Sequence, residues 1–239
     1  MAITSPTFSI QRSGERYFAD HGWLKTYHSF SFADYYDPAN LHWGALRVFN
    51  DDTVLAGAGF PEHPHKDMEI VTYVLRGELE HADSMANRGV VGPGGVQYMS
   101  AGTGIRHSEF NHSNENDLRL VQMWVLAQRS GAPPAYGQKE FSVEERLDVW
   151  LPVASGAAGP RAPIVLGQDA SFYVSRIEQG KVSHVFAPGR LGFLFVAEGQ
   201  VAANGEALGN GDAVRVAGTP DLEISGSGEL VLWDVPPIL

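Results

Sequence analysis

Two short stretches, GAGFPEHPHKDME at residues 57–69 and GTGIRHSEFN at residues 102–111, decide how this chain is interpreted. The first contains an H-x-H pair, His63 and His65, and the second contains an H-x-E pair, His107 and Glu109. Successive side chains of a β-strand point to opposite faces, so residues two apart share a face. If the two strands face each other, four ligand atoms are aimed at one point.

Three imidazoles and one carboxylate are a ligand set that suits a divalent iron, manganese, nickel, copper or zinc ion. Such an ion accepts more than these four ligands, which leaves room for water or a substrate. A lone H-x-H pair is weak evidence, because histidine pairs are also common on surfaces. The glycines beside both motifs and the strand-like surroundings favour a catalytic metal site.

The composition is that of an ordinary globular chain with one large or two small domains, at 239 residues and 44% hydrophobic content. A net charge of −11 argues against wide contact with nucleic-acid phosphates, which require Lys and Arg. The chain has no apolar run near about eighteen residues and no apolar signal core at its amino terminus, so no membrane association is expected. The absence of cysteine excludes disulfides and thiolate ligands, and a cytoplasmic location is the resulting expectation.

Short strand-like segments separated by turns follow one another along the chain, and long amphipathic helices are absent from the pattern. The strand predicted at residues 68–75 is followed by Arg76-Gly77-Glu78, which predicts a hairpin. Ser142 and Glu145 have the spacing of a capping box, so one short helix is expected over residues 143–147. The sequence therefore predicts a mostly β protein.

The second half of the chain partly repeats the first. Residues 151–163 are rich in small residues, Pro and Gly, and they separate a predicted domain 1–150 from a predicted domain 151–239. Residues 195–201 repeat the alternation and the turn glycine of residues 73–79. The same comparison places apolar residues at the ligand positions: Val185 opposite His63, Ala187 opposite His65 and Ile224 opposite His107. This indicates a duplicated barrel in which the second copy has lost its metal ligands.

The motifs resemble those of the pirin family of cupins, in particular its bacterial quercetinase-type members. The segments that carry the resemblance are HGWL at 21–24, SFSFADYYDP at 29–38, HPHKDMEI at 63–70 and MSAGTGIRHSE at 99–109. It is dense over residues 20–126 and looser beyond them. The resemblance implies an all-β bicupin, with two face-to-face jelly-roll-like barrels, few short helices and the metal in the amino-terminal barrel.

The resemblance also places the metal ligands at His63, His65, His107 and Glu109. Most cupins take their carboxylate from the first motif, which corresponds here to Glu69, whereas the pirin pattern selects Glu109. We therefore expect Glu109 to be both a ligand and a proton acceptor. Glu69 is expected to orient a ligand or to support its strand.

The activity that the resemblance implies is that of a quercetin 2,3-dioxygenase, in which dioxygen cleaves the flavonol heterocycle and carbon monoxide is released. The expected cofactor is one divalent metal, with Fe(II) preferred and Mn, Ni, Co, Cu or Zn as alternatives. A monomer that takes a flavonol and dioxygen is expected. Four aromatic or apolar residues are candidates for the mouth of the site, although a place in the barrel core is the favoured interpretation for each: Trp23, Phe60, Tyr73 and Met99.

A regulatory role is the alternative that the same resemblance offers. Pirins also act as metal-containing proteins that bind other proteins, and a flavonol would then be only a surrogate substrate. The net charge of −11 permits a protein partner and disfavours direct binding to DNA. His28, His81 and His112 lie outside the two motif pairs, and no ligand role is predicted for them.

Overall fold

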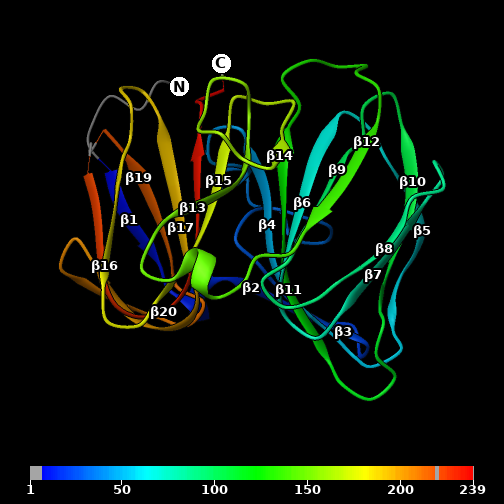
Figure 1. The fold of residues 1–239 in the computed structure, drawn as a ribbon, viewed down its shortest axis with the longest axis horizontal. Coiled ribbons are helices and arrows are strands. Elements are labelled where there is room, and N and C mark those ends of the chain that lie inside the picture. The colour runs from blue at the N-terminus through cyan, green and yellow to red at the C-terminus, as the bar shows by residue number, and fades with distance from the viewer. Residues whose placement is uncertain (1–6, 219–220, 239) are drawn as a thin grey trace.

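The computed structural model describes residues 7–218 and 221–238. Its strands form two β-barrels that lie side by side (Figure 1), so the predicted all-β bicupin is confirmed. The helical elements of the described residues are two 3-10 turns, η1 (Ser13–Glu15) and η2 (Glu144–Arg146). No helix within these ranges is long and apolar enough to cross a membrane.

The first barrel combines a seven-stranded and a four-stranded sheet, and both are antiparallel. The larger sheet has the strand order β12 (Ala135–Lys139), β9 (Val96–Ser100), β6 (Met68–Arg76), β11 (Leu118–Leu126), β4 (Leu46–Val54), β3 (Leu24–His28), β2 (Tyr17–Asp20). The smaller sheet has the order β5 (Gly59–His65), β10 (Ile105–Asn111), β7 (Leu79–Asp83), β8 (Arg88–Val91).

The turn at Gly77 connects these two sheets. Gly77 has a φ of 80°, and a Cβ at this position would lie 2.9 Å from the carbonyl oxygen of Asp117. A glycine is therefore required where the chain reverses. The predicted hairpin is wrong, however, because β6 pairs with β9 and β11 while β7 pairs with β8 and β10. The turn residues specify a change of direction and not the strand that lies alongside.

The second barrel is built on a nine-stranded sheet. Its main path is β1 (Thr7–Gln11), β19 (Ala213–Ala217), β17 (Leu191–Ala203), β20 (Asp221–Val235), β15 (Ser171–Ile177), β13 (Leu151–Ser155), β14 (Ile164–Val165). β16 (Lys181–Val185) pairs with β20, and β18 (Glu206–Gly209) pairs with β17. The amino-terminal strand β1 thus belongs to the sheet of the carboxyl-terminal half. The domain boundary predicted near residue 150 stays a prediction.

The register of the second barrel refines the comparison of the two halves. Val182 of β16 lies opposite Ile224 of β20, and both side chains are buried in one apolar cluster. Val185, which the sequence comparison matched to His63, is 68% exposed at the end of its strand. On this strand the residue paired with Ile224 is therefore Val182 and not Val185.

The largest apolar cluster joins the two barrels across their facing sheets. Phe49 of the first barrel contacts Phe193 and Phe195 of the second, with ring centroids 4.9 and 4.8 Å apart. The Trp233 indole stacks on Phe172 and its Nε1 donates a hydrogen bond to the Met123 sulfur at 3.0 Å. Burial of this aromatic surface holds the barrels in one unit.

The connection between the barrels contains η2. The backbone N–H of Ser142 donates to the Glu145 carboxylate at 2.8 Å, and the backbone N–H of Glu145 donates to the Ser142 hydroxyl at 3.3 Å. This is the capping box predicted from the sequence, and it closes a single 3-10 turn. The turn places Arg146 in a buried position between the barrels.

Candidate metal centre

The two sequence motifs lie on neighbouring strands of the four-stranded sheet. β5 and β10 are antiparallel, with His63 opposite His107 and His65 opposite Ile105. Between His107 and Glu109 the register shifts by one residue, because β5 runs three residues from His63 to Phe60 where β10 runs two, so the bulge lies on β5. The sequence argument required the two strands to face each other, and they do so as paired neighbours within one sheet. Edge-to-edge pairing brings the same side chains together on the inner face.

Three imidazoles converge at this point. One ring nitrogen from each of His63, His65 and His107 lies within 4.8 Å of the other two. The Nε2 atoms of His63 and His107 are 3.0 Å apart. Metal–nitrogen bonds are about 2.0–2.1 Å long, so two nitrogens about 90° apart around one ion lie roughly 3 Å from each other. The arrangement fits two ligands of a single metal ion.

The orientation of two of these rings is set by hydrogen bonds on their far side. The Nδ1–H of His63 can donate to the carbonyl oxygen of Pro61 at 2.8 Å, which leaves Nε2 free as a ligand. His107 Nδ1 lies 3.4 Å from Nδ1 of His81, and His81 Nε2 lies 3.3 Å from the Asp83 carboxylate. Asp83 thus orients His81, and His81 orients the His107 ring that faces the site.

Burial keeps two of the imidazoles neutral, which is the form that binds metals. It lowers the pKa of His65 to about 4, and the neighbouring His107 and His63 add to this shift. Burial likewise lowers the pKa of His107 to about 3, with further contributions from His63 and His81. At neutral pH both rings therefore present lone pairs.

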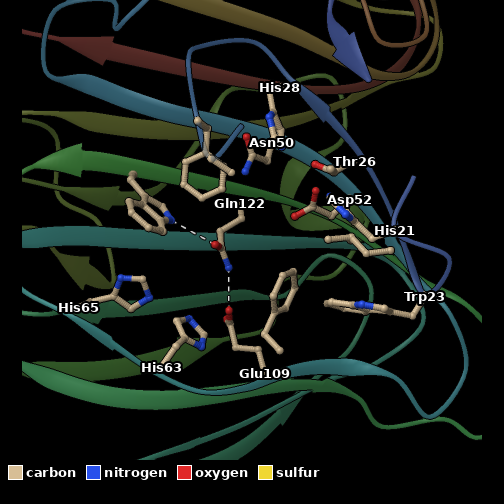
Figure 2. Close-up of a pocket in the computed structure, with 15 residues that line it drawn as sticks. His21, Trp23, Thr26, His28, Asn50, Asp52, His63, His65, Glu109 and Gln122 are labelled. Atoms are coloured by element: carbon tan, nitrogen blue, oxygen red, sulfur yellow. Dashed lines mark hydrogen bonds between the residues drawn. The ribbon is translucent and has the colours of Figure 1, made fainter. Parts of the chain in front are cut away.

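Glu109 is buried beside this cluster, and amide side chains hold both of its carboxylate oxygens. Gln97 donates to Oε1 and Gln122 donates to Oε2, each at 2.8 Å. Gln122 is itself fixed by the Trp124 indole N–H, which donates to its Oε1 at 3.1 Å. Figure 2 shows Glu109 and His63 directed into the same space. A carboxylate oxygen of Glu109 lies within 4.8 Å of ring nitrogens of His107 and His81.

Glu69 occupies a different environment. It is buried on β6, where it accepts hydrogen bonds from the Tyr98 hydroxyl, from Ser100 at 2.9 Å and from the backbone N–H of Gly167 at 3.0 Å. Gly167 belongs to the second half of the chain. Glu69 was expected either to orient a ligand or to support its strand, and its contacts match the second role. They also attach the second barrel to the first.

The cluster lies at one side of a cavity of about 390 Å³, which is within the range of small-molecule sites. Its walls include four aromatic side chains, and Lys and Arg are absent from the described residues that line it. Trp23 and Phe60 contact each other edge to face in this wall, with centroids 5.0 Å apart. Tyr73 and Met99, the other two candidates for the mouth, are fully buried core residues.

The opposite wall carries four buried polar side chains that sequence reasoning did not select: Thr26, His28, Asn50 and Asp52. They alternate along β3 and β4 (Figure 2). The spacing of two residues along each strand is the local signal that these side chains share a face. The same spacing is found on strands whose polar face is exposed to solvent, so the sequence alone does not single them out. Burial raises the pKa of Asp52 to about 7, and the charges of Asp51 and Glu109 add to the shift.

This shift predicts how stability depends on pH. The folded protein keeps the Asp52 proton up to about pH 7, whereas the unfolded chain loses it near its ordinary value of 3.8. Between these values the unfolded state binds fewer protons, so the stability contributed by the protonated group falls as pH rises and is lost above pH 7. Asp52→Asn should therefore gain stability over the wild type from pH 4 to pH 7, by at most about 4 kcal/mol for about three pKa units. Urea denaturation of the metal-free proteins at pH 5 and pH 8 measures the difference, and equal gains at both values would contradict it.

Fold and site together define a bicupin whose amino-terminal barrel carries a histidine cluster of the metal-binding type. Residues 11–125 match the family model Pirin, and residues 152–233 match the model described as the quercetinase C-terminal cupin domain. The chain belongs to the pirin family.

Similar proteins are known over nearly the whole chain. Quercetin 2,3-dioxygenase of Escherichia coli (strain K12) is 40% identical over 96% of this chain and 99% of its own. Pirin-like protein of Caulobacter vibrioides is 41% identical over 90% and 94% of the two chains. The crystal structure of YhhW from Escherichia coli has a TM-score of 0.91 and 39% identity over 97% and 98% of the chains. The structure of the same protein in complex with nickel(II) has a TM-score of 0.90 and 39% identity, over 97% and 100%.

Proposed function

We propose that this protein is a metal-dependent dioxygenase of the quercetin 2,3-dioxygenase type, which cleaves a flavonol with dioxygen and releases carbon monoxide. The observation that carries the proposal is the convergence of three imidazoles beside Glu109 at one side of an aromatic-walled cavity, with His65 and His107 kept neutral by burial. The 40% identity to the Escherichia coli protein named quercetin 2,3-dioxygenase supports the choice of substrate.

The residues that would hold the metal are His63, His65, His107 and Glu109, as one divalent ion per chain. We propose Fe(II) as the native ion, and the nickel(II) complex of the Escherichia coli relative indicates that such sites also accept nickel. When bound, the ion acts as a Lewis acid that lowers the pKa of the flavonol 3-hydroxyl.

Glu109 is the proposed acceptor of the proton of that hydroxyl. Its two oxygens already accept hydrogen bonds from Gln97 and Gln122, so the carboxylate is held in a defined orientation. The aromatic wall that includes Trp23 and Phe60 excludes water from the ring to be cleaved. These residues bind and orient the substrate and remove its proton.

Elemental analysis of the purified protein, combined with quercetin depletion under air and under nitrogen, tests the proposal. We expect about one metal per chain, depletion only in air and carbon monoxide as a product. Two metals per chain would contradict the single site. Metal retention without depletion would favour the regulatory alternative, in which the metal-loaded protein binds a protein partner. A monomeric state and a cytoplasmic location also stay predictions.

A second prediction concerns His81, which holds the ring of His107 from behind. His81→Gln should lower metal affinity by about 10- to 100-fold, as loss of a partner of a metal ligand typically does. His112→Gln is the matched control, because His112 is exposed and bonds to Glu80 at 3.0 Å outside the cavity. Titration with nickel(II) monitored by calorimetry measures both affinities. Equal affinities for the two variants would show that His81 does not support the site.

A further inference from the structure

The cavity has a second polar region, which lies across from the imidazole cluster. It consists of Thr26 and His28 on β3 and of Asn50 and Asp52 on β4, which we call the polar wall. Each of these side chains is at most 4% exposed, and each lines the cavity. In Figure 2 they stand together on one side, with Glu109, His63 and His65 on the other.

Each member of the polar wall has a buried polar atom without a hydrogen bond of good geometry, although Thr26 and Asp52 interact with each other. These atoms are Oγ1 of Thr26, Nδ1 of His28, Oδ1 of Asn50 and Oδ1 of Asp52. Buried polar atoms are normally hydrogen-bonded, and leaving one unpaired is costly. Four such side chains line one wall of the cavity, so this wall offers a bound molecule a group of polar side chains.

The chemistry of the wall restricts what that molecule is. Neither Lys nor Arg occurs among the described residues that line the cavity, while Asp52 and Glu109 place two carboxyl groups there. At the polar wall, away from the imidazole cluster and its proposed metal, a carboxylate or phosphate group would meet no cationic side chain. A hydroxyl group both donates and accepts, so it can pair with a carboxyl, an amide, an imidazole or another hydroxyl.

The aromatic lining of the cavity favours a planar molecule that reaches from the imidazole cluster to the polar wall. Trp124 contacts His65 edge to face at 4.8 Å, and Phe32 contacts Trp124 in the same way at 5.3 Å. Phe32 in turn contacts His28 at 5.3 Å, which is part of the polar wall. A continuous aromatic surface thus runs between the two polar regions, and it is suited to planar rings.

We propose that the polar wall is a recognition site for ring hydroxyl groups, and that it selects polyhydroxylated planar aromatic substrates by binding the end remote from the imidazole cluster. This inference rests on the proposed function and specifies its substrate class. Asp52 and Asn50 are the main partners, because their side chains offer the most acceptor and donor positions. A flavonol without these hydroxyls leaves the wall unsatisfied.

Two flavonols that differ only in ring hydroxyls other than the 3-hydroxyl test this proposal. 3-Hydroxyflavone has the hydroxyl and ketone next to the scissile bond, and quercetin has four further ring hydroxyls. Their dissociation constants are measured with the nickel-loaded protein under nitrogen, by fluorescence titration. We expect the wild type to bind quercetin at least about tenfold more tightly, the effect of one hydrogen bond to a charged or buried group.

Asp52→Leu and Asn50→Leu remove the polar atoms and keep the approximate side-chain volume. In each variant the ratio of the two affinities should fall toward one. Thr53→Val is the matched control, because Thr53 is the next residue on β4 and does not line the cavity. It should keep the wild-type ratio. Circular dichroism and thermal denaturation establish that all three variants are folded.

The outcomes separate the two proposals. A wild-type ratio near one, or a ratio that persists in both leucine variants, overturns the recognition site while leaving flavonol cleavage in place. If the nickel-loaded wild type binds neither flavonol and depletes neither in air, the proposed function fails and the recognition site fails with it. Collapse of the ratio in the leucine variants alone supports both.

Discussion

Glu109→Ala is expected to abolish both metal binding and flavonol cleavage, whereas Glu69→Ala keeps the metal and most of the activity. Glu109 lies in the wall of the cavity beside the imidazole cluster, where its carboxylate is the group we propose as the fourth ligand. Loss of a group that merely supports a ligand costs about 10- to 100-fold, and loss of a ligand itself should cost more. Nickel(II) titration and quercetin depletion measure the two effects separately.

Glu69 is the control that the chain itself provides, because it is an equally buried glutamate in the other sheet of the same barrel. Its carboxylate is bound to Tyr98, Ser100 and the backbone of Gly167. Glu69→Ala should therefore destabilise the attachment of the second barrel by about 1–3 kcal/mol, since it leaves buried donors unpaired. At temperatures where the variant stays folded, its metal affinity should remain within about tenfold of the wild type. This change is smaller than the one expected when a residue that supports a metal ligand is removed.

The reverse result would reassign the site. If Glu69→Ala lost the metal and Glu109→Ala retained it, the carboxylate ligand would come from the first motif, as in most cupins. The match to the pirin pattern would then fail at Glu109, the position that distinguishes this pattern from that of most cupins. The proposed proton acceptor would fail with it, because Glu109 would stand beside the metal without binding it.

The two carboxylates also show where sequence reasoning succeeds. The H-x-H and H-x-E pairs could be predicted to point to one face because the two-residue period of side-chain direction is a local property of each strand. The same reasoning does not relate His65 to Glu69, because the chain turns sharply between β5 and β6. Asp67 in this turn has a φ of 51° and is bonded to the backbone of Gly131 at 2.7 Å. A turn of this kind resets which face each following residue occupies.

Other features depend on which strands become neighbours, and local patterns carry little of that information. His81 supports His107 only because β7 lies beside β10 in the smaller sheet, and a hairpin with β6 was the local expectation. Asn50 and Asp52 alternate as residues on a solvent-exposed face do. They are buried because the four-stranded sheet and the segment that contains Phe32 enclose the same cavity. Packing between distant segments thus decides whether an alternating polar face meets water or a ligand.

Arg146→Ala is expected to destabilise the protein by about 3–5 kcal/mol, the usual cost of removing one partner of a buried ion pair. The Arg146 guanidinium bonds to the Glu229 carboxylate, and both residues are at most 6% exposed. The Tyr73 hydroxyl donates to the same carboxylate. These three residues come from the first barrel, the connecting turn and the second barrel. Without Arg146, Glu229 keeps Arg176 at 3.7 Å as its remaining cation, which favours the lower end of this range.

Urea denaturation measures this change, with Arg106→Ala as the matched control. Arg106 pairs with Glu62 at 2.7 Å, but both side chains are more than half exposed, so the loss should stay below about 1 kcal/mol. The double replacement Arg146→Met with Glu229→Leu should recover part of the stability, because it removes both buried charges together but leaves the Tyr73 hydroxyl without this acceptor. If the double variant is as unstable as Arg146→Ala, the ion pair is not the cause, and the loss comes from the packing of the Arg146 side chain against the barrels.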